Sequence, residues 1–315
     1  MKLLVTRQMT ARATQAIRDR FDATFGDETP LGPSEAAQAL ADYDAIMPTL
    51  GDAFPASAFQ GEPRCRILAN FGAGYNHIDV RAAADAGVVV TNTPDVVTEA
   101  TADIALTLIL MTMRRASEGE RILRAGQWTG WKPTQLLGGH ATGSTVGIVG
   151  MGRIGQAVAR RCHFGFGMDV VFFNRSIVTG LDVPARQIAD LDDMLARSDV
   201  AVVAVPGGAG TRHLIGAAQM AALGPAGYLV NIARGDVVDE AALIDALTDR
   251  RIAGAGLDVY EREPVVPQAL RDAPNATLLP HLGTATDDVR TAMGLRALDN
   301  LAAFARGDAP HDRVN

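Results

Sequence analysis

Three polar side chains in the second half of the sequence form a set that can assist the addition of a hydride to a carbonyl group. Arg234, Glu263 and His281 each lie at or just after an apolar run of the kind that forms a buried strand. Histidine is the side chain best suited to donate a proton near neutral pH, and a neighbouring carboxylate favours its charged form. Arginine can bind a substrate carboxylate through two parallel hydrogen bonds. This chemistry predicts His281 as proton donor, Glu263 as its partner and Arg234 as anion binder.

Each of these residues also has a structural alternative. A strand-end arginine is commonly a solvated charge, and a single histidine more often has a structural role than a catalytic one. His77 is the main alternative proton donor, because it lies near a second glycine-rich turn. The remaining histidines lie in expected loops or on the outer faces of helices and are assigned structural roles: His140, His163, His213 and His311.

Residues 145–176 are predicted to form the strand-helix-strand unit that positions this chemistry, with strands at Thr145–Val149 and Asp169–Phe173. A glycine-rich turn within it carries Gly150, Gly152 and Gly155 in G-x-G-x-x-G spacing. The first glycine permits a tight turn, the second lets a pyrophosphate approach the backbone, and the third lets helix and strand pack closely. The helix expected over Gln156–Phe164 adds free N–H groups at its start. The unit therefore predicts a dinucleotide-binding site.

The end of this unit indicates which dinucleotide is bound. NAD-binding units carry an acidic residue about twenty residues after the glycines, where it binds the ribose 2′-hydroxyl. Here the position is taken by Asn174, followed by Arg175 and Ser176. An uncharged residue beside a guanidinium suits a 2′-phosphate. We therefore predict NADP(H) as the preferred cofactor, with NAD(H) as the alternative if Arg175 is only a solvated surface charge.

Composition narrows the class of protein. A chain of 315 residues exceeds one ordinary core, so two domains are expected. The net charge of −7 argues against nucleic acid and anionic membrane as partners. No apolar run approaches the roughly 20 residues that span a bilayer. The 2 cysteines lack the spacing of metal ligands, and with no signal-peptide pattern they favour a reducing cytoplasm.

Strands and helices alternate along the chain, which predicts parallel sheets covered by helices. Before residue 98, strands are expected at Leu3–Thr6, Ala45–Pro48, Arg66–Asn70 and Val88–Asn92, and helices at Thr10–Phe21, Pro33–Ala41 and Val80–Ala86. After the dinucleotide unit, strands are expected at Val200–Val205, Tyr228–Ile232, Gly256–Val259 and Thr277–Leu279, and helices at Leu191–Arg197, Gly216–Leu223, Glu240–Asp249 and Thr286–Arg306.

Two further segments carry functional hypotheses. The turn Gly72-Ala73-Gly74 follows an expected strand and can present backbone N–H groups to a small anion, although it could also be a plain connection. Glu99–Ala125 is predicted as one long helix, apolar almost all round in its first half, and therefore buried on more than one side. The tryptophan-containing loop 126–143 follows it, and both segments suggest a contact between two copies of the chain.

Several motifs together resemble the D-isomer-specific 2-hydroxyacid dehydrogenase family, and within it the glyoxylate/hydroxypyruvate reductases. They are NFGAGYNHID at 70–79, TEATAD at 98–103, TVGIVGMGRIGQAVARR at 145–161, NIARGDVVDEAAL at 231–243, GLDVYEREP at 256–264 and PHLGTAT at 280–286. The resemblance implies that Arg234, Glu263 and His281 are the catalytic residues, with the glutamate that precedes a proline chosen over Glu261.

The resemblance also implies further contacts. The backbone at Ala73 and Gly74 is expected to bind the substrate carboxylate, and Asp258 to face the nicotinamide amide. Trp131 matches a tryptophan that reaches the neighbouring subunit's site, although packing at a dimer contact explains it equally well. The predicted cofactor site further includes Arg153, Ile154, Pro206, Thr211, Ile232 and Gly283.

These observations predict an α/β fold with two doubly wound parallel-sheet domains. A Rossmann-type dinucleotide-binding domain is expected over 98–285, and a flavodoxin-like substrate domain over 1–97 plus 286–315. The expected activity is NADPH-dependent reduction of glyoxylate or hydroxypyruvate by a cytoplasmic homodimer without a metal. The alternatives are a dehydrogenase of D-lactate, phosphoglycerate or 2-ketogluconate type, and a dinucleotide-sensing regulator similar to a corepressor.

Overall fold

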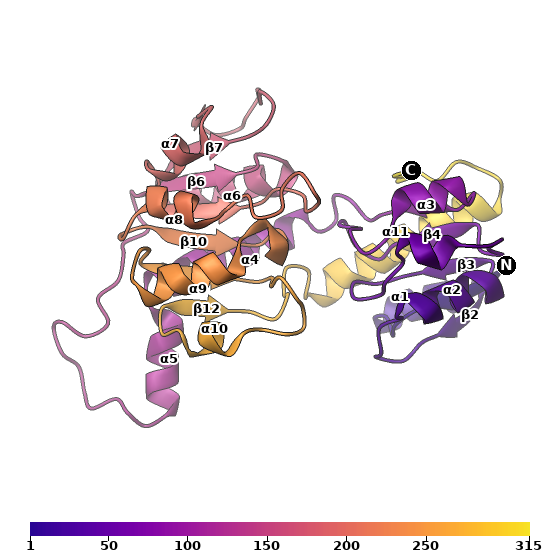
Figure 1. Ribbon diagram of the computed structural model, residues 1–315, viewed down its shortest axis with the longest axis horizontal. Helices are drawn as coiled ribbons and strands as arrows, with labels where there is room; N and C mark the ends of the chain where they lie inside the picture. The colour runs from indigo at the N-terminus through magenta and orange to yellow at the C-terminus, as the bar shows by residue number, and fades with distance from the viewer. The chain divides into compact units, whose positions relative to one another are not determined.

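The computed structural model describes residues 1–315, which cluster into two compact units. Unit 1 comprises Met1–Val97 and Thr284–Asn315, and unit 2 comprises Thr98–Gly283. Each unit is built on its own parallel sheet (Figure 1). The predicted fold class is therefore confirmed. None of the helices combines the length and the apolar composition needed to cross a bilayer.

Unit 1 contains a five-stranded sheet with the order β2-β1-β3-β4-β5, which is the flavodoxin-like arrangement. Its strands are β1 (Lys2–Val5), β2 (Asp22–Phe25), β3 (Ala45–Met47), β4 (Ile67–Ala69) and β5 (Val89–Thr91). Successive side chains of β1 enter different cores, Leu3 and Val5 on one face and Leu4 on the other. β2 was not predicted, because an edge strand of alternating exposure contains no continuous apolar run.

Helices cover both faces of this sheet. They are α1 (Ala11–Arg18), α2 (Pro33–Asp42), the short 3₁₀ helix η1 (Ala56–Phe59), α3 (Val80–Asp85) and α11 (Asp287–Ala305). α11 joins a core that contains residues from both ends of the sequence, including Val5, Ile17 and Leu301. The chain then returns along β5, where the N–H of Val314 donates to the carbonyl of Val90 at 2.9 Å.

Unit 2 contains a seven-stranded sheet with the order β12-β11-β10-β9-β6-β7-β8. Its strands are β6 (Thr145–Val149), β7 (Asp169–Phe173), β8 (Ala185–Gln187), β9 (Val200–Val203), β10 (Tyr228–Asn231), β11 (Gly254–Leu257) and β12 (Ala276–Leu278). Counted from β6, the strand order contains the 3-2-1-4-5-6 order of the Rossmann fold. The order reverses at β6, so the glycine-rich turn after β6 lies at the topological switch point where such sheets bind ligands.

The helices of unit 2 are α4 (Thr98–Met113), α5 (Ala116–Arg124), α6 (Arg153–Phe166), α7 (Leu191–Leu195), α8 (Ala217–Leu223), α9 (Glu240–Thr248) and α10 (Gln268–Asp272), with the 3₁₀ turn η2 (Gly235–Val237). α4 packs against α6 and against β10 and β11. Its side chains Ala105, Leu108 and Ile109 are fully buried, whereas Asp103 and Thr107 on its remaining face are exposed.

The prediction of one helix over Glu99–Ala125 is wrong. The helix stops after Met113, and Arg115 adopts a left-handed conformation with φ of 53° before α5 begins. The returning chain explains the break, because the N–H of Gly139 donates to the carbonyl of Met113 at 2.8 Å. That carbonyl is therefore bound from outside the helix. α5 and the loop after it extend away from the sheet of unit 2 (Figure 1).

Candidate active site

The three predicted catalytic side chains follow three adjacent strands of unit 2. Arg234 follows β10, Glu263 follows β11 and His281 follows β12. These strands pair in parallel, so their carboxyl ends share one edge of the sheet. The fold therefore brings together residues that are far apart in the sequence.

Glu263 and His281 form a direct pair. His281 Nδ1 lies 2.8 Å from Glu263 Oε2, and the other carboxylate oxygen accepts the N–H of Tyr260 at 3.0 Å. With Nδ1 facing the carboxylate, the imidazole is oriented and Nε2 is the atom that can transfer a proton. The pair is about one-third accessible, since each side chain is 29% exposed. It is thus both held in place and open to a substrate.

The surroundings of Glu263 favour its ionised form. Burial alone would raise the pKa of Glu263, but the hydrogen bond and charge of His281, the N–H of Tyr260 and the charge of Arg234 outweigh it. The net pKa lies below the ordinary value. Glu263 is therefore a carboxylate at neutral pH, and a carboxylate stabilises the imidazolium form of a hydrogen-bonded histidine.

Asp258 fixes the backbone that carries the histidine. His281 has a positive φ of 54°, and its N–H donates to the carbonyl of Asp258 at 2.9 Å. The Asp258 carboxylate accepts the N–H of Leu282 at 2.6 Å and that of Gly283 at 2.8 Å. Burial raises the pKa of Asp258, and these N–H groups and the His281 charge offset only part of the rise. The predicted role of Asp258 toward a nicotinamide amide stays a prediction.

Arg234 is a desolvated cation without a carboxylate partner at salt-bridge distance. Burial lowers the pKa of Arg234, although the charges of Glu263 and Asp236 act in the opposite direction. Its Nη1 donates to the carbonyl of Ala233 at 2.7 Å, and its remaining N–H donors bind no other residue of the chain. A buried guanidinium of this kind favours an anionic ligand, which would compensate its charge.

Two residues that position Arg234 were not predicted. Asn231 Nδ2 donates to the carbonyl of Arg234 at 2.9 Å, and its Oδ1 accepts the N–H of Ala233 at 3.0 Å. Gly235 packs so closely on the next loop that an added Cβ would lie 1.8 Å from the carbonyl carbon of Tyr260. The glycine after the arginine is the signal in the sequence, since it indicates a close approach of two backbones.

A cluster of ion pairs anchors the loop that contains Glu263. Arg212 Nη2 and His213 Nε2 each lie 3.2 Å from Glu261 Oε1. The N–H of Glu261 donates to Glu240 Oε2 at 3.3 Å, and burial raises the pKa of Glu240. His213 thus has a structural partner, as predicted from its place in the sequence. The cluster holds the loop two residues away from the catalytic candidate.

The turn after β6 has the geometry that a dinucleotide needs. Gly150 has a φ of +101°, and a Cβ on Gly155 would lie 2.2 Å from the carbonyl oxygen of Gly150. A Cβ on Gly152 would meet nothing within 4 Å, so the backbone there faces open space. α6 begins directly after it with Arg153 and Ile154. The three glycines therefore fit their expected roles toward a pyrophosphate.

The segment after β7 is linked to this turn. Asn174 Oδ1 accepts the N–H of Met151 at 3.3 Å, and Asn174 Nδ2 donates to the carbonyl of Ser176 at 2.9 Å. Arg175 between them is exposed and forms no ion pair with the chain. No acidic side chain occupies this position.

The other predicted cofactor residues lie at the same edge of the sheet. Thr211 Oγ1 donates to the carbonyl of Pro206 at 2.7 Å and closes the loop after β9. Ile232 directly follows β10 and is 6% exposed. The carbonyl of Gly283 accepts the hydroxyl of Thr101 at 3.2 Å.

The remaining predicted residues belong to other parts of the chain. Ala73, Gly74 and His77 belong to unit 1, where the turn 72–74 follows β4. Trp131 is 80% exposed in the loop after α5, and Leu123, Trp128 and Leu137 of the same region are exposed as well.

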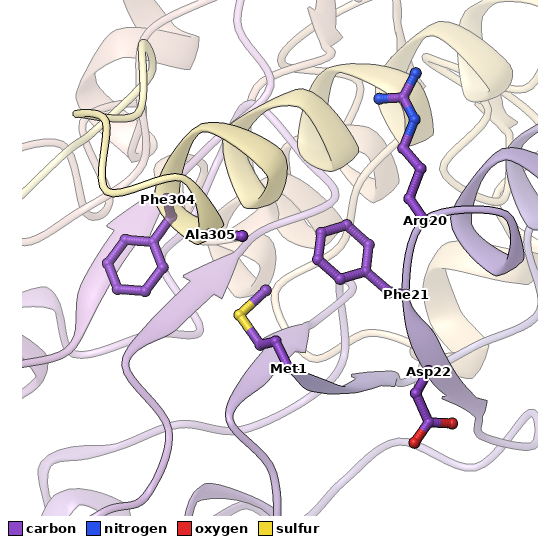
Figure 2. Close-up of a pocket in the computed structure, with 6 residues that line it drawn as sticks. All are labelled: Met1, Arg20, Phe21, Asp22, Phe304 and Ala305. Carbon is purple, nitrogen blue, oxygen red and sulfur yellow. The ribbon is translucent and has the colours of Figure 1, made fainter.

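Unit 1 also has a hollow at the amino end of its sheet, which Figure 2 shows. It is lined by Met1, Arg20, Phe21, Asp22, Phe304 and Ala305. Its two charged side chains are exposed, and Arg20 already pairs with Asp299 at 3.4 Å. The hollow contains no acid-base pair, in contrast to the edge of unit 2 described above.

Known proteins share both the sequence and the fold. A family model described as "D-isomer specific 2-hydroxyacid dehydrogenase, NAD binding domain" matches residues 106–283. A glyoxylate reductase of Thermococcus gammatolerans is 40% identical, over 100% of this chain and 96% of its own length.

Two solved structures are similar over nearly the whole chain. A protein of Thermus thermophilus superposes with a TM-score of 0.91 at 36% identity, covering 100% of both chains. An NADPH-dependent glyoxylate/hydroxypyruvate reductase of Sinorhizobium meliloti, solved with NADP and malonate, gives a TM-score of 0.88 at 38% identity, covering 99% of this chain and 96% of the other. The protein therefore belongs to the D-isomer specific 2-hydroxyacid dehydrogenase family and is an oxidoreductase close to the glyoxylate reductases.

Proposed function

We propose that the protein uses NADPH to reduce a small 2-oxo acid, glyoxylate or hydroxypyruvate, to the corresponding 2-hydroxy acid. One observation carries the proposal. The Glu263–His281 pair, 2.8 Å apart, follows strands adjacent to the one that leads into Arg234, in a sheet that also holds a dinucleotide turn. A proton donor beside an unpartnered cation suits a substrate that has both a carbonyl group and a carboxylate.

Each of the three side chains has a separate role in the proposed reaction. Arg234 binds the substrate carboxylate and polarises the neighbouring carbonyl oxygen. His281 Nε2 donates the proton to that oxygen, and Glu263 keeps the imidazole charged and oriented. When bound, the reduced nicotinamide supplies the hydride for the carbonyl carbon. The backbone N–H groups of Ala73 and Gly74 are proposed as a second partner of the carboxylate.

The NADPH preference rests on the segment after β7. Asn174, Arg175 and Ser176 would hold the 2′-phosphate, while Gly150, Gly152 and the start of α6 would hold the pyrophosphate. Support comes from the free, exposed guanidinium of Arg175 and from the absence of an acidic side chain at this position. Arg175→Ala should raise the KM for NADPH about tenfold, the loss of one charge-assisted contact, with little change for NADH. Equal effects on both cofactors would contradict the phosphate role.

We also propose that the active protein is a cytoplasmic homodimer. Several large apolar side chains of α5 and its loop are exposed, among them Leu123, Trp128 and Trp131, and such residues within one short segment suggest a contact with another protein chain. The two buried free thiols, Cys65 and Cys162, fit a reducing compartment. Sedimentation velocity of the wild type and of Trp131→Ala tests the dimer, since a wild-type monomer at micromolar concentration would contradict it.

The decisive experiment is a panel of 2-oxo acids assayed with NADPH and NADH in parallel. We expect glyoxylate and hydroxypyruvate to be reduced with a kcat of at least about 1 s⁻¹, the lower end for typical enzymes. Faster turnover of pyruvate, phosphohydroxypyruvate or a sugar-derived 2-keto acid would assign another substrate. Cofactor binding without turnover of any acid would contradict the enzyme and favour a dinucleotide-sensing regulator.

A further inference from the structure

All three carbonyl groups of the turn 72–74 of unit 1 accept side-chain hydrogen bonds, and that of Gly72 also accepts the N–H of Thr93 at 3.0 Å. Asn70 Nδ2 donates to the carbonyl of Gly72 at 2.9 Å and to that of Gly74 at 3.1 Å. Asn92 Nδ2 donates to the carbonyl between them, that of Ala73, at 2.8 Å. Two asparagine side chains therefore bind three successive carbonyl oxygens.

The N–H groups of the same turn remain available. The N–H of Gly72 donates to the carbonyl of Asn70 at 3.0 Å, but those of Ala73 and Gly74 donate to no acceptor of the chain. Both residues are half-buried. Consecutive N–H groups without acceptors make a concave site of positive potential, which suits a small anion.

Both asparagines lie at the carboxyl ends of adjacent strands of the sheet. Asn70 directly follows β4 and is fully buried, and Asn92 directly follows the adjacent parallel strand β5. The N–H of Asn92 donates to the carbonyl of Asp312 at 3.2 Å. Asp312 is in turn held by Arg296, whose Nε and Nη2 donate to its carboxylate at 2.6 and 2.8 Å. The donors that bind the turn are therefore rigidly placed.

We propose that Asn70 and Asn92 are positioning residues that hold the turn in its anion-binding form. This inference rests on the proposed function, in which the turn binds the substrate carboxylate. A carbonyl oxygen that rotated outward would place negative partial charge against the carboxylate. An amide side chain prevents this rotation with uncharged donors, whereas an aspartate of the same size would offer only acceptors to the three carbonyls. Neither asparagine needs to touch the substrate.

The test is Asn70→Asp in the full-length protein, which replaces the donor without changing the side-chain volume. We expect the KM for glyoxylate to rise at least about tenfold, the equivalent of one lost hydrogen bond, with inhibition by malonate weakened in parallel. The KM for NADPH should stay within about twofold and kcat should change much less than KM. Asn92→Asp, which affects one carbonyl, should show the same split with a smaller rise.

A pH series separates positioning from a general loss of structure. Below its own pKa the introduced carboxyl carries a proton and can again donate one hydrogen bond. The ratio of kcat/KM between Asn70→Asp and the wild type should therefore increase as the pH falls. Recovery of kcat/KM while the Tm of the variant relative to the wild type stays constant over the same pH range separates positioning of the turn from support of the fold.

The matched control is Asn275→Asp. Asn275 Nδ2 also donates to two carbonyls, those of Leu247 at 3.3 Å and Ala253 at 3.4 Å, but it precedes β12 at the amino end of the other sheet. We expect this variant to lower Tm and to leave the KM for glyoxylate unchanged. An Asn70→Asp protein that folds and keeps the wild-type KM would overturn the inference.

Two further outcomes are a variant that does not fold and a wild type without activity. If Asn70→Asp does not fold, Asn92→Asp decides, and an unchanged KM in that variant overturns the inference. If the wild type reduces no 2-oxo acid, the proposed function fails instead. Calorimetric titration of malonate into wild type and Asn70→Asp, each with NADPH, then tests the turn alone. Equal affinities would overturn the inference.

Discussion

The two glycine-rich turns of the molecule are both proposed to bind anions, but their backbone N–H groups are aligned in different ways. Each follows a buried strand of a parallel sheet, the turn 150–155 after β6 and the turn 72–74 after β4. The first leads directly into α6, whose opening N–H groups face the same way because the helix aligns them. The second is followed by a loop, and α3 begins only at Val80. There the alignment depends on the side chains of Asn70 and Asn92.

The conformation of the first turn is specified by neighbouring residues, whereas that of the second turn also depends on a residue distant in the sequence. A helix start is local, so three glycines and the helix that follows are enough to specify the first turn. The second turn depends on a residue 19 positions away, because the side chain of Asn92, at the end of the next strand, donates to the carbonyl of Ala73. In the proposed function, the first turn binds the cofactor and the second turn binds the substrate carboxylate. Proton transfer is assigned to neither.

The largest predicted effect therefore lies outside both turns. His281→Ala should lower kcat for glyoxylate by about 10²–10⁴, the usual contribution of a general acid. The KM for NADPH should be nearly unchanged. Steady-state kinetics beside His140→Ala, an exposed histidine in a loop, gives the control. Near wild-type turnover of His281→Ala would mean that another side chain, such as His77 near the second turn, contributes the proton.

A smaller effect should distinguish the glycines within the first turn. Gly155→Ala places a methyl group 2.2 Å from the carbonyl oxygen of Gly150, so the free energy of unfolding should fall by about 3 kcal/mol. Gly152→Ala meets nothing within 4 Å and should leave that free energy within about 0.5 kcal/mol of wild type.

Urea unfolding measures both glycine variants, and cofactor titration completes the test. Gly152→Ala should still weaken NADPH binding, because its methyl group points where the pyrophosphate must approach. A Gly152→Ala protein of normal stability and normal affinity would show that the first turn does not bind the dinucleotide as proposed.

The smallest effect concerns the pH dependence of stability. Neither turn contains a carboxylate, and Glu263 is the carboxylate of the candidate site whose pKa is lowered by its surroundings. Its pKa is lower in the folded chain than in the unfolded one, so its ionised form adds stability at neutral pH that is lost as the pH falls through the folded pKa.

Glu263→Gln removes this contribution. The free energy of unfolding of the variant should therefore decrease less than that of the wild type between about pH 6 and about pH 3, which brackets the ordinary glutamate pKa. Asp258 is present in both proteins, but the charge of Glu263 contributes to its raised pKa. Its effect on the pH dependence is therefore smaller in the variant, which opposes part of the expected difference. Parallel decreases would show that the ion pair with His281 contributes nothing to folding.

The sequence predicted the interior of the fold better than its periphery. The bounds predicted for β6 and β7 agree with the structure, because both strands are continuous apolar runs. β2 and β8 are edge strands with partly exposed side chains and were missed. The break at Arg115 was missed because the helix ends where Gly139 binds Met113, a contact between distant residues.

The candidate site was likewise predicted only in part. Arg234, Glu263 and His281 could be found because each follows a recognisable strand, and parallel strands place their carboxyl ends together. The residues that hold them in place were not predicted. Asn231 and Gly235 act through backbone groups, and the Arg212–Glu261 pair joins two loops. Such contacts leave no periodic pattern in the sequence.

The return of the chain to unit 1 has a consequence for protein synthesis. One core of that unit combines Leu3, Val5 and Ile17 with Ala297 and Leu301 of α11. A ribosome makes the first three of these residues long before the last two, with the whole of unit 2 in between. Unit 2 is continuous in sequence and can complete its cores during elongation, since domains fold as units while the chain grows. The apolar side chains of β1 and α1 must therefore wait for those of α11 before this core is complete.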